Sequence, residues 1–174
     1  VARVAAGQRV LVHGGAGGVG WLAAQIARHR GADVAATCGP QSVALLQDLG
    51  VDRAIDYARE DFVEAAGLCD VVLDSVGGAV HERSFAALKP GGILVYVHAS
   101  PIGPPARSDV RIARAEVRAT SDQLAALLDL AARGALKPRI GRTWPFDQSP
   151  QAYAVSATGH APGKQVIVMN GASG

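Results

Sequence analysis

The chain has 174 residues, of which 49% are hydrophobic and 18% charged, and its formal net charge is only +2. This length and composition favour a globular protein with one sizeable core. No basic run stands out, so nucleic acid is not an expected partner, and the longest apolar runs are too short to cross a membrane. Two cysteines, Cys38 and Cys69, are too few for a disulfide framework or a cysteine-rich metal site, so a cytoplasmic location is the simplest expectation.

Strands and helices are predicted to alternate over most of the chain. Short apolar runs predict strands, and apolar residues spaced three or four apart predict helices. The predicted strands span residues 8–13, 33–37, 53–56, 70–74, 93–97 and 110–118. The predicted helices span residues 21–30, 42–49, 62–66, 80–88 and 122–133, with a turn at 89–92 and a Pro- and Gly-rich loop at 101–108. This alternation predicts an α/β fold, a Rossmann-type doubly wound parallel sheet of about six strands with helices on both faces.

The final stretch follows a different pattern. It is predicted to contain an extended segment at 137–144, a helix at 149–157 and a strand at 165–169. A six-stranded sheet has no place for these elements. We therefore divide the chain into a Rossmann domain, residues 1–136, and a C-terminal segment, residues 137–174.

A glycine-rich loop separates the first predicted strand from the first predicted helix. Its sequence, Gly15-Ala16-Gly17-Gly18-Val19-Gly20, matches the dinucleotide fingerprint G-x-G-x-x-G in the expected context. We expect Gly15 to allow the tight turn, Gly17 to let a pyrophosphate approach the backbone, and Gly20 to let the helix pack closely. Amides of the first helical turn would then face the phosphates of NAD(P)H. The alternative is a strand-to-helix turn that binds no ligand.

The loop after the second predicted strand bears on the choice of cofactor. NAD-binding sites usually carry an acid about 20 residues after the glycine loop, which accepts a hydrogen bond from the ribose 2′-hydroxyl. Here the sequence Thr37-Cys38-Gly39-Pro40-Gln41-Ser42 has no acid, and it has no Arg or Lys either. NADPH is therefore favoured, with NADH as the alternative. The hydroxyls of Thr37 and Ser42 could contact a 2′-phosphate or serve only turn and capping roles, and Cys38 is expected to be a packed residue rather than a nucleophile.

A co-linear set of motifs runs along the chain. The set comprises Val10-Leu11-Val12-His13-Gly14 with the glycine loop, Leu49-Gly50-Val51-Asp52, Ile55-Asp56-Tyr57, Asp70-Val71-Val72-Leu73-Asp74-Ser75-Val76-Gly77-Gly78, Leu88-Lys89-Pro90-Gly91-Gly92 and Gly159-His160-Ala161-Pro162-Gly163-Lys164. Together these motifs resemble the quinone oxidoreductase-like, zinc-independent branch of the medium-chain dehydrogenase/reductase superfamily. The resemblance implies an NAD(P)H-dependent oxidoreductase. In the family, hydride passes from nicotinamide to a quinone or an α,β-unsaturated carbonyl, generally without catalytic zinc.

The resemblance also implies roles for individual residues. The pyrophosphate would lie on Ala16 to Gly20, the adenosine ribose on Cys38, Gly39 and Ser42, and the adenine or its phosphate beside Tyr57. The nicotinamide side would be lined by Val76 and Gly77 and by Val97, His98 and Ala99, although for His98 the role of a polar strand end is the favoured interpretation. No acid or base is singled out for catalysis. His13 and His81 lack partners at metal-ligand spacing and are expected to be structural, and Asp74 is expected to bond backbone amides at a strand end.

Two departures from the family matter. Many members carry a Lys near the position of Ser42, and here it is absent. The N-terminal GroES-like substrate domain is also missing, although residues 137–144 and 165–169 resemble segments that complete it. We therefore expect either a fragment of a longer enzyme or a stand-alone module, with reduced activity in isolation. The alternatives are a non-catalytic nucleotide-binding module and, less favoured because His13-Gly14 replaces an acid after the first strand, an S-adenosylmethionine-dependent methyltransferase.

The strand predicted at 110–118 is the last of its half of the sheet and hence an edge strand. An uncovered edge invites pairing with another chain, and the resemblance points to a homodimer through this edge. Val110, Ile112 and Val117 would supply apolar contacts. The alternative is that Arg111, Arg114 and Arg118 keep the edge solvated.

Overall fold

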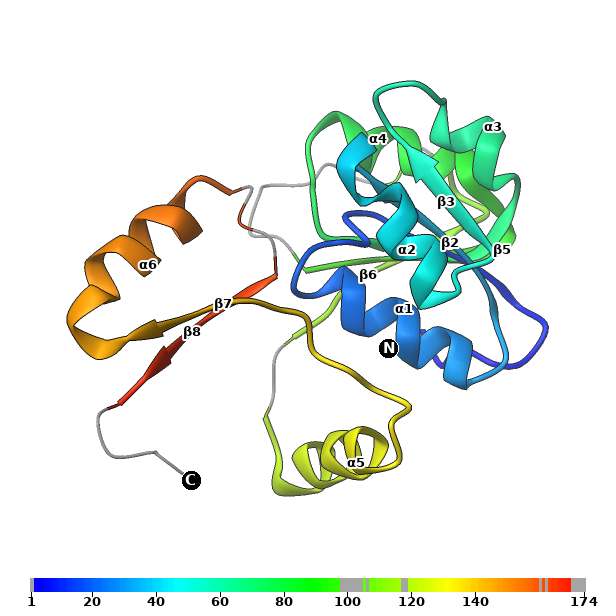
Figure 1. The fold of residues 1–174 in the computed structure, drawn as a ribbon. Helices are drawn as coiled ribbons and strands as arrows, with labels where there is room; N and C mark the ends of the chain where they lie inside the picture. Colours follow the sequence, from blue (N-terminus) through cyan, green and yellow to red (C-terminus); the bar gives the residue numbers. More distant parts are fainter. Residues whose placement is uncertain are drawn as a thin grey trace. The chain divides into compact units, whose positions relative to one another are not determined.

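A computed structural model describes residues 2–97, 105, 107–116, 119–159, 161 and 163–169. The chain divides into two compact units, Val1–Leu136 and Lys137–Gly174 (Figure 1). No helix in the described residues is long and apolar enough to cross a membrane.

The first unit is built on a six-stranded sheet in which every neighbouring pair of strands is parallel. The order is β3-β2-β1-β4-β5-β6, the doubly wound arrangement, so the predicted fold class is confirmed. The strands are β1 (Arg9–Val12), β2 (Asp33–Cys38), β3 (Arg53–Asp56), β4 (Cys69–Asp74), β5 (Leu88–Tyr96) and β6 (Arg111–Arg114). The helices are α1 (Gly20–His29), α2 (Val43–Leu49), α3 (Phe62–Ala66), α4 (Ala79–Ser84) and α5 (Ser121–Ala132), with short 3₁₀ turns η1 (Pro40–Ser42) and η2 (Phe85–Ala87).

Two apolar clusters pack on opposite faces of this sheet. Successive strand residues point to opposite faces, and β1 contributes to both clusters. Val12 packs with Trp21 of α1 and Leu46 of α2 on one face. Leu11 packs with Phe62 of α3 on the other face. The expectation of helices on both faces is therefore met by the packing of the core.

The structure corrects two of the predicted strands. Residues 89–92 lie inside β5 rather than in a turn before it, because Leu88 already pairs with Cys69 and the register then shifts before Val71 meets Ile93. The extra residues form a bulge in which Gly91 has a left-handed φ of 78°. β6 ends at Arg114, four residues before the predicted end. Residues 117–118 and most of the predicted loop 101–108 lie outside the described residues.

The second unit contains a pair of parallel strands and one helix. These are β7 (Ile140–Pro145), β8 (Lys164–Val168) and α6 (Ser149–Ala157), with a 3₁₀ turn η3 (Phe146–Gln148) before the helix. Trp144 is its buried anchor, and its indole Nε1–H donates to Gln165 Oε1 at 2.8 Å. The guanidinium of Arg142 lies over the Trp144 ring, 3.8 Å from the ring centroid.

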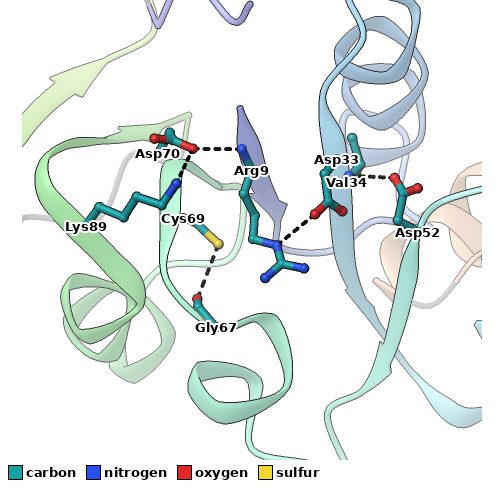
Figure 2. Close-up of polar contacts among 8 residues, drawn as sticks. All are labelled: Arg9, Asp33, Val34, Asp52, Gly67, Cys69, Asp70 and Lys89. Carbon is teal, nitrogen blue, oxygen red and sulfur yellow. Dashed lines mark hydrogen bonds and ion pairs between the residues drawn. The ribbon is translucent and has the colours of Figure 1, made fainter. Parts of the chain in front are cut away.

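At the amino ends of the central strands, side chains join neighbouring strands through hydrogen bonds and ion pairs (Figure 2). Asp70 Oδ2 accepts hydrogen bonds from the Arg9 backbone N–H at 2.8 Å and from Lys89 Nζ at 2.9 Å. On the neighbouring strands, Asp52 Oδ2 accepts the Val34 N–H at 2.8 Å. Partial burial raises the pKa of Asp70, but the hydrogen bonds from Lys89 and Arg9 outweigh it and hold this pKa below its ordinary value. Asp70 thus joins β1, β4 and β5 at this end of the sheet.

We expect Asp70→Asn to lower the free energy of unfolding at pH 7 by about 1 kcal/mol, because the ion pair with a half-exposed lysine is lost. A carboxyl with a depressed pKa stabilises the fold above its unfolded pKa of about 4 and loses that contribution as the pH falls. Urea unfolding at pH 7 and pH 3 should therefore show a difference between wild type and variant that shrinks on acidification.

Asp48→Asn, at an exposed aspartate of α2, is the matched control and should change little at either pH. A difference between wild type and Asp70→Asn that stays constant with pH would contradict this role for Asp70.

Candidate cofactor-binding site

The glycine loop joins the end of β1 to the start of α1. Gly14, not Gly15, carries the left-handed backbone of the turn, with a φ of 66°. The Gly15 N–H donates to Thr37 O at 2.8 Å, and the Gly17 N–H donates to Gly14 O at 2.9 Å. The loop is thereby fixed to β2 and folded back on itself. The tight-turn role expected of Gly15 falls on its neighbour.

The three fingerprint glycines differ in what requires them. A Cβ on Gly20 would lie 2.8 Å from the Gly14 carbonyl carbon, and one on Gly15 would lie 2.7 Å from Ala36 Cβ. Internal packing therefore excludes a side chain at both positions. A Cβ on Gly17 would meet only Gly14 O, at 3.1 Å, with nothing else within 4 Å. The space over exposed Gly17 fits a group from outside the chain, such as a pyrophosphate lying against the backbone.

The amino end of α1 suits an anion. Its N-cap residue, Val19, makes no side-chain cap, and the first turn carries no acidic residue. The first amides of the helix thus have no side-chain acceptor, and the positive end of the helix dipole is uncompensated. Together with the open backbone at Gly17, this end fits the phosphates of a dinucleotide.

A buried polar group lies beneath the loop. His13, only 1% exposed, has Nδ1 at 3.2 Å from Thr37 Oγ1 and Nε2 at 3.0 Å from Ser84 Oγ. Thr37 Oγ1 also accepts the Gly14 N–H at 3.2 Å. Burial lowers the pKa of His13 to about 4, although the nearby Asp74 charge opposes the shift. The ring is therefore neutral near pH 7, and the Thr37 hydroxyl supports the glycine loop from below.

The loop after β4 is held by one fully buried carboxylate. Asp74 Oδ1 accepts the N–H groups of Val76 at 2.8 Å and Gly77 at 2.9 Å, which confirms the expected bonding to backbone amides. Its Oδ2 lies 2.8 Å from His81 Nδ1. His81 is buried on α4. Sequence reasoning missed this pair because no motif marks an Asp and a His seven positions apart.

The residues expected beside the adenosine come together at the ends of β2 and β3. Cys38 is paired with Asp56, and the Tyr57 N–H donates to Cys38 O at 3.2 Å. The Tyr57 hydroxyl lies close over Gly39, since a Cβ there would be 3.2 Å from it. The Ser42 N–H donates to Gly39 O at 2.9 Å. Burial, and then the charge of Asp56, raise the pKa of Cys38 to about 11, so this thiol is a packed, unreactive group.

The remaining predicted residues lie on the other side of the glycine loop. Val76 is 54% exposed, and Gly77 is buried with a left-handed φ of 84°. The Val97 N–H donates to Asp74 O at 3.1 Å, which places Val97 beside the end of β4. His98 and Ala99 lie outside the described residues. The described candidates thus lie at or just after the carboxyl ends of β1 to β5, where ligands bind in open α/β sheets.

The difference between the fingerprint glycines yields a test. We expect Gly17→Ala to lose less stability than Gly20→Ala and to lose most of its affinity for NADPH, because the methyl group makes one close contact, with Gly14 O at 3.1 Å, and otherwise enters the space left for the phosphates. Gly20→Ala is the contrasting variant and should lose roughly 1–3 kcal/mol of folding free energy, because the methyl overlaps backbone atoms. Calorimetric melts and titrations measure both. If Gly17→Ala binds NADPH as the wild type does, the phosphates do not lie at this position.

Comparison with known proteins places the chain in a family. A family model described as zinc-binding dehydrogenase matches residues 49–167. A 2-methylene-furan-3-one reductase of Solanum lycopersicum is 38% identical over 165 residues, covering 92% of this chain and 40% of that protein. An Arabidopsis thaliana protein, the chloroplastic NADPH-dependent alkenal/one oxidoreductase, is 33% identical over 166 residues, covering 93% of this chain and 41% of that protein.

Among solved structures, the quinone oxidoreductase from Coxiella burnetii superposes with a TM-score of 0.85 at 31% identity, covering 95% of this chain and 54% of that one. The chain thus spans about two fifths to one half of these relatives. Within its described residues, no three His, Cys, Asp or Glu side chains gather as metal ligands. The chain belongs to the zinc-binding dehydrogenase family, in the quinone oxidoreductase-like branch of the medium-chain dehydrogenase/reductases.

Proposed function

We propose that this chain is the NADPH-binding part of an oxidoreductase that reduces quinones or α,β-unsaturated carbonyls. The observation that carries the proposal is the open backbone at Gly17, which faces the uncapped start of α1 and is not required by the packing of the chain itself. Its relatives include a 2-methylene-furan-3-one reductase, an alkenal/one oxidoreductase and a quinone oxidoreductase, which are all named for acceptors that carry a conjugated carbonyl.

The contribution of this chain to the reaction is binding and orientation. When bound, NADPH would supply a hydride, and water would supply the proton that completes reduction of the acceptor. The loop from Ala16 to Gly20 would hold the pyrophosphate, and Cys38, Gly39, Ser42 and Tyr57 would surround the adenosine. Val76, Gly77 and Val97 line the nicotinamide side, with His98 and Ala99 assigned there by resemblance. No side chain of this chain is proposed as an acid or a base.

The charges around the proposed adenosine site, formed by Cys38, Gly39, Ser42 and Tyr57 and called the adenosine corner below, support NADPH over NADH. No acid ends β2, and the nearest one, Asp56 of β3, is buried and accepts the Ala58 N–H at 3.0 Å. Arg59 Nε lies 3.6 Å from Asp56 Oδ2 and is highly exposed. The end of β2, where an NAD-binding site usually carries an acid, therefore presents no carboxylate to a 2′-phosphate. Arg59, two residues after Tyr57, provides a positive charge that the loop from Cys38 to Ser42 lacks.

Exposed apolar groups support a further proposal, that α5 and the second unit pack with a substrate domain of the kind implied by the resemblance. α5 buries none of its residues and exposes Leu124, Leu127 and Leu128. In its described residues, the second unit has a two-stranded sheet, a size that is marginal alone, and it exposes Ile140 and Ile167. A covering domain would bury these groups and complete the acceptor site.

Cofactor binding and turnover test the proposed function together. We expect the 174-residue chain to bind NADPH at least as tightly as NADH in a calorimetric titration, and Arg59→Ala to weaken only the binding of NADPH. Reduction of 2-cyclohexenone or a simple quinone should be slow, because an open site leaves water at the reacting centre and does not orient the acceptor.

S-Adenosylmethionine is the control ligand, and Arg30→Ala, at an exposed arginine beyond the end of α1, is the control variant. Clear preference for NADH would contradict the choice of cofactor. Binding of S-adenosylmethionine alone would favour a methyltransferase, and cofactor binding by the whole protein without any hydride transfer would favour a non-catalytic module. Turnover of the isolated chain at ordinary enzyme rates would contradict the need for a substrate domain.

We also propose that the chain forms a homodimer through β6, an edge strand of the sheet. The Ala115 N–H donates to Tyr96 O, toward β5. Because amides alternate in direction along a strand, those of Ile112 and Arg114 point away from β5. They are available to an antiparallel strand of a second copy, and such pairing about a two-fold axis makes an isologous dimer.

Ile112→Pro should convert the dimer to a monomer, because it removes an outward-pointing donor and leaves the hydrogen bonds to β5 in place. Arg114→Ala keeps its amide and should remain dimeric. Light scattering at high concentration measures both variants. A monomeric wild type, or a proline variant that stays dimeric, would show that β6 is not the interface.

A further inference from the structure

A line of three buried polar side chains crosses the molecule beneath the proposed cofactor site. His13 follows β1, Thr37 lies in β2 and Ser84 ends α4. Their exposed fractions are 1%, 4% and 0%. None of the three has a chemical role in the function proposed above. Buried polar groups are costly unless satisfied, so the arrangement calls for a physical reason.

The hydrogen bonds along this line all run in one direction. The Ser84 hydroxyl donates its one hydrogen to Val80 O at 2.6 Å, so toward His13 it can only accept, and the proton of the ring lies on Nε2. His13 Nδ1 of the neutral ring is then an acceptor for the Thr37 hydroxyl. Thr37 Oγ1 in turn accepts the Gly14 N–H. The chain of donors runs from the Gly14 amide through Thr37, His13 and Ser84 to the Val80 carbonyl.

The two ends of this chain lie on the two halves of the proposed dinucleotide site. Gly14 begins the turn that carries the pyrophosphate loop, and Val80 lies in the first turn of α4, directly after the loop beside the nicotinamide. A second bond reinforces the link, because the Ser75 hydroxyl donates to His13 O at 2.9 Å. His13 is therefore joined to both loops, through its ring and through its backbone.

We infer that His13 is a positioning residue whose one-directional hydrogen-bond chain fixes the nicotinamide-side loop relative to the pyrophosphate loop. The inference rests on the proposed function. An extended dinucleotide spans both loops, and it binds well only if their separation matches its length. A ligand that contains only the adenosine half touches one loop and is insensitive to that separation.

The test compares a whole cofactor with its adenosine half. NADPH and 2′,5′-ADP are titrated into the wild type and into Ser84→Ala, which breaks the chain at α4 and leaves the bonds of the glycine loop untouched. We expect NADPH affinity to fall about tenfold, the effect of one lost hydrogen bond, with 2′,5′-ADP affinity unchanged. The fluorescence of bound NADPH should shift toward that of the free cofactor, because the nicotinamide is less well held.

Two variants of Thr37 distinguish a positioning role of these hydrogen bonds from a role in packing alone. One variant removes the hydroxyl and the other retains it. Thr37→Val replaces the hydroxyl with a methyl group of similar size and should weaken NADPH binding at least as much as Ser84→Ala does, because it also removes the acceptor of the Gly14 N–H. Thr37→Ser keeps the hydroxyl and should restore binding. If these hydrogen bonds act as one unit, the double variant Thr37→Val/Ser84→Ala should bind NADPH no more weakly than whichever single variant has the lower affinity. Thermal melts of each variant identify any that do not fold, and Ser84→Ala and Thr37→Val provide independent breaks.

Equal losses of NADPH and 2′,5′-ADP in both variants would overturn the inference, since the chain would then support only the glycine loop. Unchanged NADPH binding in both folded variants would also overturn it, while the proposed function would stand. A wild type that binds neither ligand would instead refute the proposed function, and the positioning role with it.

Discussion

α1 begins so close to the end of β1 that a side chain at Gly20 would overlap the backbone of Gly14 and Gly15. The helix begins without a side-chain cap, and its Trp21 N–H donates to Gly17 O at 3.0 Å. The close approach also forces the chain into a left-handed turn at Gly14, which requires support from below. That support comes from Thr37, whose hydroxyl and carbonyl both bond to the turn. The turn at Gly14, the start of α1 and the hydrogen bonds from Thr37 are thus all linked to the close approach of Gly20 to the backbone of Gly14 and Gly15.

The two ends of the sheet use polar groups in opposite ways. At the amino ends, the carboxylates of Asp70 and Asp52 accept the first amides of neighbouring strands and leave little for a ligand to bind. At the carboxyl ends, the backbone at Gly17 is open, and the fully buried carboxylate of Asp74 accepts the Val76 and Gly77 amides and so holds the loop after β4. The ion pairs at the amino end are partly exposed and individually weak. The apolar clusters on the two faces therefore carry most of the stability.

Local patterns were sufficient to predict most elements of the fold. The boundaries of β3 and α3 agree with the sequence, because glycine and polar residues bound short apolar runs there. The start of β5 could not be predicted, because Pro90 and the two following glycines look like a turn until the pairing of Leu88 with Cys69 is known. The length of β6 was overestimated, since charged and apolar residues alternate past its end without marking it.

In the candidate site too, residues within a local motif could be predicted from the sequence, whereas residues joined by long-range contacts could not. The glycine loop is contiguous in sequence, so its motif was visible. The contacts of His13 join residues that are 24 and 71 positions apart, and no single-sequence pattern connects them. The pairing of Asp74 with His81 depends on how α4 packs after its loop. Residues whose role is to hold others in place are thus the ones that only the folded chain reveals.

The state of the two cysteines has a practical consequence. Both are buried and unpaired, and burial raises the pKa of Cys38 and of Cys69 to about 11. At neutral pH only about one in ten thousand of either thiol is ionised, and the thiolate is the form that reacts with maleimides. A cysteine introduced at the exposed Gln41, beside the adenosine corner, can therefore take a fluorescent label selectively with the native cysteines left in place. The chain is already suited to carry an optical reporter of nucleotide binding.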